Sequence, residues 1–368
     1  MRILFAGGGT AGHINPALAI ANRFKEMQTD TEVHFVGTKE GLETSLIPHS
    51  GYTLDTIKVH GFERKISLKT FKNMLEIPRA VAASRKIIKK FKPDAVVGTG
   101  GYVCGPVLYA AAKMGIPTLV HESNAFPGIT TKLLSGCVDT VAIGIQAAEK
   151  YLQKSKNIVF TGNPVRPSIL SVDSFDARRS MGLDERPFIV IFGGSLGARD
   201  FNAAAADWIS SVADYGKYQI LMATGKNNQY DTVMSRFSQN GIDINKYTDI
   251  TVNEYIYDMD IAMNAADLVI SRAGASTLAE LTAIGKPAIL VPSPYVTDNH
   301  QEHNARAVEK VGGAVVILEN DFSAESINKT VNEILTDKER LAQMKKKSSQ
   351  MGVKNSAERI CDEVLKLI

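Results

Sequence analysis

The chain of 368 residues is longer than one hydrophobic core usually organises, so its length predicts two domains. Hydrophobic residues make up 44% of it and charged residues 22%, which is typical of a globular protein and excludes a disordered or fibrous chain. A net charge of +3 argues against extensive nucleic-acid binding, and we expect no nucleic acid among its partners.

Three cysteines, Cys104, Cys137 and Cys361, are too few and too widely spaced for a disulfide framework or a cysteine-based zinc site. They fit a protein of the reducing cytoplasm. The apolar stretch at the amino terminus is short for a secretory signal, and the longest uncharged run, residues 95–112, is interrupted by glycines and a proline. We therefore expect a cytoplasmic chain without a membrane-spanning helix.

Apolar, strand-like runs alternate with helical patterns along the whole chain, which is typical of parallel sheets covered by helices. The first half contains six predicted strands, at residues 2–6, 32–36, 95–98, 117–121, 140–142 and 158–160. Helices, for example at 16–27 and 105–114, connect them. The second half contains six more strands, at residues 188–192, 219–223, 249–251, 268–271, 288–291 and 314–317. We predict an α/β protein made of two doubly wound, Rossmann-like domains.

The domain boundary is predicted at residues 162–167, where two prolines fix the backbone in an extended path. The amino-terminal domain would comprise residues 1–163 and the carboxyl-terminal domain residues 164–349. A short amphipathic helix at 356–367 has no strand after it, and we expect residues 350–368 to pack back on the first domain. Ligands bind at the carboxyl ends of parallel strands, so the two sheets are expected to face one cleft.

A glycine-rich pattern, Gly-Gly-Ser/Thr-x-Gly, follows the first strand of each half, at residues 8–12 and at residues 193–197. The first copy also fits a dinucleotide-binding fingerprint, but the second strand lacks the acidic residue at its tip that would hold a ribose. A phosphate-binding P-loop is excluded as well, because His13 stands where that motif requires lysine. What remains is either a row of amides at a helix start, suited to an anionic or polyhydroxy ligand, or a purely structural tight turn.

His13 ends the first loop, and an imidazole titrates near neutral pH. It is a candidate general base or hydrogen-bond donor, the alternative being a residue that only caps the helix. In the second half, backbone amides and the hydroxyl of Ser195 form a predicted diphosphate cradle. Another helix begins after the strand at 268–271, and Glu280 on its second turn could accept both hydroxyls of a ribose or only complement the helix dipole.

Two segments resemble metal sites, and we reject both. Asp258 and Asp260 form a D-x-D pair, but they begin a predicted helix, where acidic residues usually cap the amino terminus, and no other ligand cluster accompanies them. His300 and His303 lack a third ligand motif. The amide of Gln301 between them suits sugar hydroxyls, because it offers both donors and an acceptor. We expect no metal and no cofactor.

Together these motifs resemble the MurG family, bacterial glycosyltransferases that add N-acetylglucosamine (GlcNAc) from UDP-GlcNAc to the lipid-linked muramyl pentapeptide of cell-wall synthesis. The similarity covers essentially the whole chain. It rests on ordered matches at residues 8–13, 100–106, 121–124, 162–166, 193–198, 272–280 and 301–305. The resemblance implies a glycosyltransferase-B (GT-B) architecture, inversion at the anomeric carbon and no required metal.

The resemblance also implies roles for individual residues. In the donor site, Glu280 would hold the ribose and the backbone of Ile256 would read the uracil. The other implied donor contacts are diphosphate ligands at Arg166, Ser195, Ala275, Ser276 and Thr277, sugar ligands at Asn124, His300 and Gln301, and loop contacts at Thr10 and Gly12. The acceptor would meet Gly9, Gly100, Gly101 and Tyr102. His13 would take the proton from the attacking C4 hydroxyl.

In the implied reaction the acceptor hydroxyl displaces UDP from the anomeric carbon, and helix amino termini with Arg166 or Arg272 neutralise the leaving diphosphate. The sequence departs from the family at Ser123, Leu196 and His300, where members often have glutamine. The main alternative is a UDP-GlcNAc 2-epimerase, which has a similar fold and nucleotide but no use for a membrane-binding patch. An NAD-dependent oxidoreductase is disfavoured by the missing ribose acid. A non-catalytic membrane adaptor would leave the sugar-nucleotide motifs idle.

Positive charge is concentrated in the first half. Residues 1–165 carry 20 basic and 12 acidic residues, whereas the remainder carries 22 and 27, and the stretch 58–92 alone has 11 basic and 2 acidic ones. Its apolar residues are Ile66, Leu68, Phe71, Met74, Leu75 and Ile77, and its basic residues include Lys65, Lys69, Lys72, Arg79, Arg85, Lys86, Lys89, Lys90 and Lys92. An amphipathic helix packed on the sheet would give the same pattern. We expect a surface that docks on the anionic, cytoplasmic face of the cell membrane, because the implied acceptor, lipid I, cannot leave the bilayer.

Overall fold

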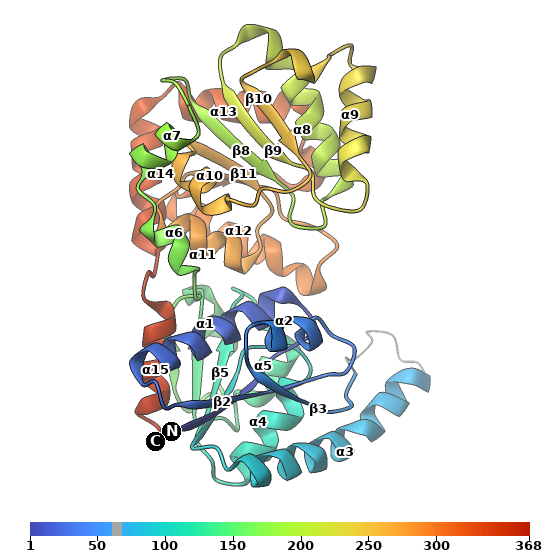
Figure 1. Cartoon of the computed structure of the whole chain (residues 1–368), viewed down its shortest axis with the longest axis vertical. Helices are drawn as coiled ribbons and strands as arrows, with labels where there is room; N and C mark the ends of the chain where they lie inside the picture. Colours follow the sequence, from blue (N-terminus) through green and yellow to red (C-terminus); the bar gives the residue numbers. More distant parts are fainter. Residues whose placement is uncertain (61–67) are drawn as a thin grey trace. The chain divides into compact units, whose positions relative to one another are not determined.

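The computed structural model describes the backbone of residues 1–60 and 68–368, and the side chains of all of these except residues 68–75. The chain divides into two compact units (Figure 1). The first comprises Met1–Val165 and Val353–Ile368, and the second comprises Arg166–Gly352. Within the described residues, no helix is both long and apolar enough to cross a membrane.

The described part of the first unit contains a parallel sheet of seven strands, ordered β3-β2-β1-β4-β5-β6-β7. The strands are β1 (Arg2–Ala6), β2 (Glu32–Gly37), β3 (Thr53–Thr56), β4 (Ala95–Gly98), β5 (Thr118–Glu122), β6 (Thr140–Ile143) and β7 (Ile158–Phe160). Side chains of β1 alternate between two cores: Ile3 and Phe5 join one, and Leu4 and Ala6 join the other. Both faces of the sheet are therefore buried, which explains why its central strands read as continuous apolar runs.

Helices cover both faces of this sheet. They are α1 (Ala11–Met27), α2 (Glu43–His49), α3 (Leu68–Phe91), α4 (Cys104–Lys113), α5 (Ile129–Leu134) and α15 (Ser356–Leu365), with a 3₁₀ turn at Gln146–Tyr151. On one face α1 packs against α2 and α15, and on the other face α4 packs against α3 and α5. Two distinct helical layers thus enclose the first sheet.

The last helix of the chain belongs to the first unit. Figure 1 shows α15 alongside α1, the first helix. Ile360, Cys361 and Val364 of α15 are fully buried in the same core as α1. The hydroxyl of Ser356 donates a hydrogen bond to the Thr161 carbonyl at 2.8 Å. Burying this apolar face stabilises the unit, because each fully buried aliphatic side chain contributes roughly 1.5–3 kcal/mol.

The described residues of the second unit form a parallel sheet of six strands, ordered β10-β9-β8-β11-β12-β13. The strands are β8 (Phe188–Phe192), β9 (Gln219–Ala223), β10 (Ile250–Asn253), β11 (Leu268–Ser271), β12 (Ala288–Leu290) and β13 (Ala314–Val316). The helices are α6 (Pro167–Ser171), α7 (Ser174–Ser180), α8 (Arg199–Val212), α9 (Gln229–Gln239), α10 (Met259–Ala265), α11 (Ala275–Ala283), α12 (His300–Val311), α13 (Ala324–Leu335) and α14 (Lys338–Met351). Trp208 of α8 is fully buried in the largest core, between β8, β9, α9 and α13.

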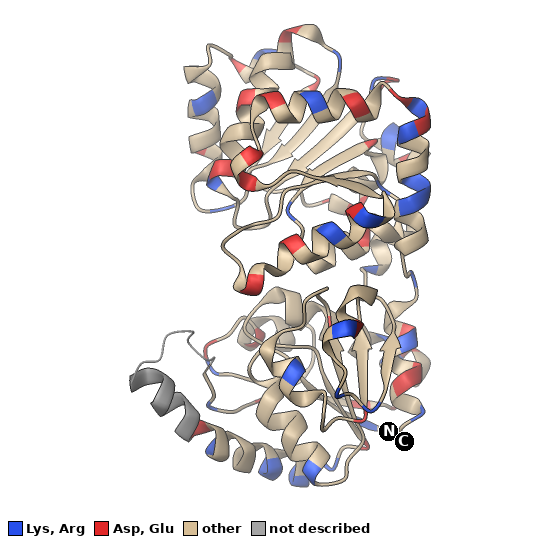
Figure 2. Ribbon diagram, turned by 180° about the vertical axis from the view of Figure 1, so that it is seen from behind, with Lys and Arg blue, Asp and Glu red and all other residues tan. Residues whose placement is uncertain are grey.

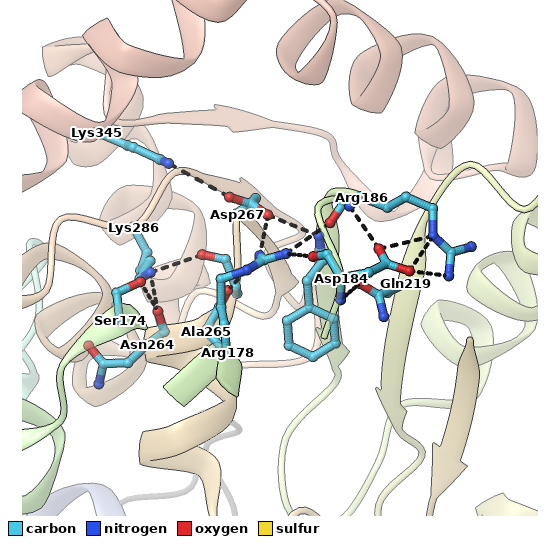
Figure 3. A network of polar contacts seen from close by, with 12 residues as sticks. Ser174, Arg178, Asp184, Arg186, Gln219, Asn264, Ala265, Asp267, Lys286 and Lys345 are labelled. Atoms are coloured by element: carbon cyan, nitrogen blue, oxygen red, sulfur yellow. Dashed lines mark hydrogen bonds and ion pairs between the residues drawn. The ribbon is translucent and has the colours of Figure 1, made fainter. Parts of the chain in front are cut away.

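A network of polar contacts lies at the amino edge of the second sheet (Figure 3). Arg178 of α7 donates to the carboxylate of Asp267 at 2.8 Å, and this carboxylate also accepts the amide of Phe188 at 3.0 Å. Lys286 is buried and donates to the Asn264 carbonyl near the end of α10 at 2.6 Å. These contacts join α7 to the starts of β8 and β11, and α10 to the start of β12. We assign them a structural role, because ligands of parallel sheets bind at the opposite, carboxyl edge.

The predicted fold class is confirmed, and each of the twelve predicted strands is present within a residue or two. The prediction misses β3, an edge strand of four residues that lacks an apolar run and is only partly buried. The prediction about Asp258 is wrong in one detail. Asp258 precedes α10 as expected, but its side chain makes no capping hydrogen bond, and its backbone dihedral angles are not those of a usual cap.

Candidate active site

The first glycine loop joins β1 to α1 at the carboxyl edge of the first sheet. Gly9 has a φ of +86°, and its amide donates to the Glu43 carboxylate at 2.9 Å. Glu43 begins α2, is fully buried, and also accepts the amide and the hydroxyl of Thr38 at 2.9 and 2.7 Å. Burial alone would raise the pKa of the Glu43 carboxyl, but the hydrogen bonds from Thr38 and Gly9 outweigh it and hold the pKa below its usual value.

This carboxylate changes the interpretation of Gly9. The sequence predicts Gly9 as an acceptor contact in a loop whose amides suit an anion. In the structure the Gly9 amide is already bonded to a carboxylate of the chain itself. A buried negative charge beside the loop also disfavours a diphosphate in the same place. Any contact between Gly9 and the acceptor therefore uses atoms other than this amide.

The second loop of the first unit, after β4, contacts the first loop directly. Gly100 and Gly101 have φ values of +113° and +81°, a conformation that favours glycine. A Cβ on Gly101 would lie 2.4 Å from the Gly8 carbonyl oxygen, so only glycine allows this approach. A Cβ on Gly9 would lie 3.6 Å from the ring of Tyr102. The predicted acceptor residues of the two loops are therefore neighbours.

His13 lies on the first turn of α1 beside the second loop. Its carbonyl accepts the hydroxyl of Thr99 at 2.7 Å. A Cβ on Gly100 would lie 2.3 Å from Nδ1 of His13, so the imidazole packs directly on the Gly100 backbone. Thr10, the residue before α1, makes no side-chain capping hydrogen bond, and His13 follows it on the first turn. Its role as general base stays a prediction.

Asn124, the predicted sugar ligand of the first unit, follows β5. Its backbone amide and its side-chain amide donate to the Glu122 carboxylate at 3.0 and 3.2 Å. Nearby, His121 is fully buried and donates from Nε2 to the Gly162 carbonyl at 3.2 Å. Burial lowers the pKa of His121 to about 4, although Gly162 and Glu122 oppose this shift. His121 is therefore neutral at physiological pH.

The predicted site residues of the first unit gather at one edge of its sheet. They follow β1, β4 and β5, strands that are adjacent in the sheet order. These residues are Gly9, Thr10, Gly12, His13, Gly100, Gly101, Tyr102 and Asn124. The carboxyl ends of parallel strands thus bring together segments that lie more than a hundred positions apart in the sequence.

The second glycine loop, between β8 and α8, is closed by backbone contacts. Gly194 and Gly197 have φ values of +102° and +77°. The amide of Lys226 donates to the Ser195 carbonyl at 3.1 Å, and a Cβ on Gly197 would lie 2.3 Å from the Thr224 carbonyl oxygen. Among the residues that the structure describes, no carboxylate accepts a hydrogen bond from this loop. Ser195 is exposed, as a diphosphate ligand must be.

A cavity of about 370 Å³ lies beside the second loop. Glycines of the loop line it together with residues that follow β11 and β12, among them Arg272, Gly274, Thr277, Ser293 and Gln301. Thr277 is on the first turn of α11 with Ala275 and Ser276, and this helix also lacks a side-chain cap at its amino terminus. The cavity therefore adjoins uncapped helix amides, which favour an anionic ligand.

Arg166 and Glu280 bind each other in the second unit. Nε and Nη2 of Arg166 donate to the two carboxylate oxygens of Glu280 at 2.7 and 3.2 Å. This hydrogen-bonded pairing with Glu280 raises the pKa of the Arg166 guanidinium. The sequence assigns Glu280 to the ribose and Arg166 to the diphosphate, without predicting a contact between them. Both residues retain further hydrogen-bonding capacity, because a carboxylate offers about four lone-pair sites and a guanidinium five N–H groups.

Arg272 is mostly buried where it lines the cavity beside the second loop. Its guanidinium donates to Glu319 at 2.7 Å and to the Val291 carbonyl at 3.2 Å. The charge of Arg272 is therefore compensated within the protein, and truncating either partner would leave a buried charge unpaired. Arg166 is the more exposed candidate cation for the leaving group, and the role of Arg272 stays a prediction.

The two predicted sugar ligands of the second unit differ in their hydrogen bonds. His300 donates from Nδ1 to the Thr297 carbonyl at 2.7 Å, so a sugar contact would use Nε2. The Oε1 atom of Gln301 accepts the amides of Ala273 and Ser293 at 3.3 and 3.0 Å. Its carbonyl is thus engaged with the backbone, and a sugar contact would use the side-chain NH₂ group.

Ile256, whose backbone is predicted to read the uracil, follows β10. Its side chain is buried, whereas the flanking Tyr255 and Tyr257 are 40% and 86% exposed. A second cavity of about 520 Å³ is lined by these three residues and extends along β9 and β10. Exposed aromatic rings that line a cavity suit a flat base.

The described residues contain no group of three or more His, Cys, Asp or Glu side chains that could hold a metal ion. Asp258 and Asp260 lie at the start of α10, where Oδ1 of Asp260 accepts the amide of Ile261 at 3.1 Å. His303 is exposed on α12.

The sequence interpretation missed three residues that shape the first unit. Glu43 and Glu122 bind loop amides, and the Sγ atom of Cys104 donates to the carbonyls of Ala6 and Gly100 at 2.9 and 3.0 Å. The position of Glu43 in the sequence could have indicated this role, because Glu43 follows the end of β2 by only six residues. The dinucleotide fingerprint requires an acid at the strand tip, whereas α2 carries Glu43 back to the loop.

Both halves of the chain match known domains. Residues 3–143 match the glycosyltransferase family 28 N-terminal domain, and residues 188–360 match the glycosyltransferase family 28 C-terminal domain. A protein of Acetivibrio thermocellus is 49% identical over 98% of this chain and 96% of its own length, and one of Bacillus thuringiensis is 43% identical over the whole of both. Both are named as N-acetylglucosamine transferases of UDP-N-acetylglucosamine and N-acetylmuramyl-(pentapeptide) pyrophosphoryl-undecaprenol. The chain belongs to glycosyltransferase family 28, among the MurG enzymes.

Solved structures agree with this family. MurG of Acinetobacter baumannii is 27% identical, with a TM-score of 0.80 over 99% of both chains. A UDP-GlcNAc 2-epimerase of Neisseria meningitidis, solved with UDP-GlcNAc bound, is 15% identical with a TM-score of 0.68, and this likeness shows a common fold only. The MurG family member described here therefore has the two-domain GT-B fold that its sequence predicts.

Proposed function

We propose that this MurG family member transfers GlcNAc from UDP-GlcNAc to the C4 hydroxyl of lipid-linked N-acetylmuramyl pentapeptide, converting lipid I to lipid II in peptidoglycan synthesis. Identity of 43–49% along essentially the whole chain with transferases of that name carries the proposal. The family's amino-terminal and carboxyl-terminal domains are both matched.

The donor binds the second unit in this proposal. Glu280 accepts the ribose hydroxyls with lone pairs that Arg166 leaves open, and Ile256 presents backbone groups to the uracil between two exposed tyrosines. Ser195 and the start of α11 hold the diphosphate beside the cavity of about 370 Å³. The sugar contacts in this unit come from Gln301 and His300.

Leaving-group stabilisation follows from the same elements. α8 and α11 begin at the carboxyl edge of the second sheet, and neither has a side-chain capping bond. Their first amides carry a partial positive charge, and Arg166 adds a full one. Charge growing on the leaving diphosphate is stabilised most strongly by such preorganised donors. We propose that they serve this step without a metal cofactor.

The acceptor binds the first unit, with its C4 hydroxyl near His13. The imidazole is half-buried on the first turn of α1, against Gly100 and close to the loop that bears Tyr102. As a general base it accepts the hydroxyl proton while the oxygen attacks the anomeric carbon. The C–O bond to the sugar forms as the bond to UDP breaks, with inversion of configuration. Tyr102 and Gly101 would position the acceptor sugar.

We also propose that α3 docks the enzyme on the cytoplasmic face of the membrane, as a peripheral protein. In its described part, Ala80, Ser84 and Ile88 are buried against the unit. The opposite side is exposed and basic, at Arg79, Arg85, Lys86, Lys89 and Lys90 (Figure 2). This half of α3 is thus the packed amphipathic helix that the sequence left as an alternative, with a charged face available to anionic lipids.

The rest of the predicted membrane patch lies outside the described residues. This applies to Lys65 and Ile66, and to the side chains of Leu68, Lys69, Phe71, Lys72, Met74 and Leu75. A largely apolar cavity of about 600 Å³ is lined by the described part of α3 together with α4 and α5, and Leu133 among its lining residues is 71% exposed. Apolar residues beside basic ones are the combination that peripheral membrane binding requires.

One assay tests the proposed function. UDP release from UDP-GlcNAc is measured with and without a lipid-linked muramyl acceptor, and the nucleotide sugar is recovered and identified. The proposal predicts UDP release that depends on the acceptor. A 2-epimerase would convert the nucleotide sugar without an acceptor, and that result would replace the proposal.

A further inference from the structure

Glu43 lies beneath the first glycine loop, in a space made by three glycines. A Cβ on Gly8, Gly37 or Gly41 would lie 2.5, 2.6 or 2.0 Å from atoms of the Glu43 side chain. These glycines come from the loop, from the end of β2 and from the segment before α2. Three separate segments therefore leave room for one carboxylate, which is fully buried and cannot meet solvent or a ligand directly.

A second carboxylate of the first unit shows which part of this arrangement is unusual. Asp139, at the amino edge of the same sheet, accepts the amide and the hydroxyl of Thr118 at 3.0 and 2.9 Å. Glu43 makes the same pair of bonds with Thr38 at the carboxyl edge. A carboxylate that accepts both the amide and the hydroxyl of one threonine therefore occurs at both edges of the sheet and has a structural role. The bond to the Gly9 amide is additional, and it reaches the predicted acceptor loop.

The position of the Gly8–Gly9 turn affects the other groups of the acceptor site. The Gly8 carbonyl abuts Gly101, and the Cβ position of Gly9 lies 3.6 Å from Tyr102. His13 follows four residues later on the first turn of α1. A shift of the turn would therefore move the imidazole and the tyrosine ring together.

We propose that Glu43 is a positioning residue for the acceptor side of glycosyl transfer. Its carboxylate fixes the Gly8–Gly9 turn and, through it, His13 and Tyr102, and it takes the amide that would otherwise be offered to the acceptor diphosphate. The first loop then presents the imidazole and neutral groups to the acceptor sugar. This inference rests on the proposed function and adds a residue that does not touch substrate.

The test compares Glu43→Gln with Asp139→Asn, a matched carboxamide change at the other edge of the sheet. Glu43→Gln can still accept one amide with its oxygen but cannot accept a second with its NH₂ group. We expect kcat to fall between about tenfold and 10²-fold, the scale of a small misplacement of reacting groups, with the KM for UDP-GlcNAc unchanged. Asp139→Asn should keep kcat within about twofold of wild type, and thermal unfolding of both variants shows whether stability alone explains the difference.

A second variant and a readout without turnover separate this inference from the proposed function. Gly8→Ala should displace the Glu43 carboxylate and reproduce the fall in kcat, whereas Thr38→Val should not, because it keeps the bond to Gly9. In Glu43→Gln the NMR signals of the His13 imidazole should shift, whether or not the enzyme turns over. Wild-type kcat in both Glu43→Gln and Gly8→Ala, or an equal loss in Asp139→Asn, would overturn the inference.

Discussion

The two glycine loops share one sequence pattern but differ in what binds their amides. In the first loop the Gly9 amide is bonded to the buried carboxylate of Glu43. In the second loop the Gly197 amide donates to the Gly194 carbonyl of the same loop at 3.0 Å, and a cavity of about 370 Å³ adjoins the glycines. A repeated motif therefore does not imply a repeated ligand.

The difference has an electrostatic meaning. Amides at a helix start attract anions, and a protein carboxylate placed among them cancels that attraction. The second loop keeps the attraction for the donor diphosphate, whereas the first uses it to hold its own geometry. The first unit would accordingly contribute to turnover and the second to donor binding.

The largest expected effect is on turnover, through the first unit. His13→Ala should lower kcat by about 10²–10⁴-fold, the usual contribution of a general base, and should leave donor binding nearly unchanged. Steady-state kinetics with both substrates varied would measure this, together with direct titration of UDP. A kcat close to wild type would show that His13 has a structural role only and would remove the base from the first loop.

Membrane binding should also depend on the first unit alone. Reversing the charge of Lys65, Lys69 and Lys72 to Glu should weaken binding to anionic vesicles by at least about 3 kcal/mol, at roughly 1 kcal/mol for each lysine lost. Turnover of a short, water-soluble acceptor analogue should remain nearly intact. The measurement is vesicle sedimentation at low and high salt. Equal binding of the triple variant and wild type would place the membrane-binding face elsewhere.

The first unit should lose stability in acid because of His121. Its pKa is about 4 in the folded protein and 6.5 ordinarily, so between these values the unfolded chain binds a proton that the folded unit does not. Stability therefore falls as the pH drops from 6.5 to about 4, by up to about 3 kcal/mol. Hydrogen exchange of β5 amides would report this loss, and fluorescence of Trp208 would report the second unit separately. His121→Asn should flatten the dependence; an unchanged slope would assign it to other groups.

Donor affinity should depend on the second unit. Glu280→Ala removes hydrogen bonds of roughly 1.5–3 kcal/mol each to the ribose. The apparent dissociation constant for UDP-GlcNAc should therefore rise at least about tenfold. Glu280→Gln, which keeps the shape but not the charge, is the matched variant, and it also removes the ion pair with Arg166. Donor affinity that is unchanged in folded Glu280→Ala would exclude the ribose contact.

The smallest expected effect is that of chelation. Helix amides and Arg166 are proposed to stabilise the leaving diphosphate, so EDTA should leave the rate unchanged. Loss of turnover in EDTA, with recovery on adding magnesium or manganese, would show that the leaving diphosphate needs a metal. Asp258 and Asp260 would then be candidate metal ligands.

The fold was predictable because its strands are apolar on both faces and regularly spaced. β1 and β8 each follow this rule, and each is followed by glycines that mark the loop. The edge strand β3 was not predictable, because Thr53–Thr56 has no apolar run and is only partly buried. Edge strands depend on pairing with a neighbour, which the local sequence does not encode.

The candidate site was predictable in its loops but not in its internal pairings. Motifs after strands identify Ser195, Glu280 and His13 individually. They do not show that Glu280 meets Arg166, 114 positions away, or that Glu43 meets Gly9 across 34 positions. Arg272 illustrates the same limit, because its burial against Glu319 depends on a loop after another strand. Such pairings follow from packing rather than from local pattern.

The most direct test of the contrast between the loops uses protein labelled with ¹⁵N-glycine and titrated with UDP, which carries the diphosphate but no sugar. We expect the amide signals of Gly193 and Gly194 to shift with saturation, while the signal of Gly9 stays in place because its proton is held by Glu43. A large shift of Gly9, with the second-loop glycines unmoved, would contradict this expectation.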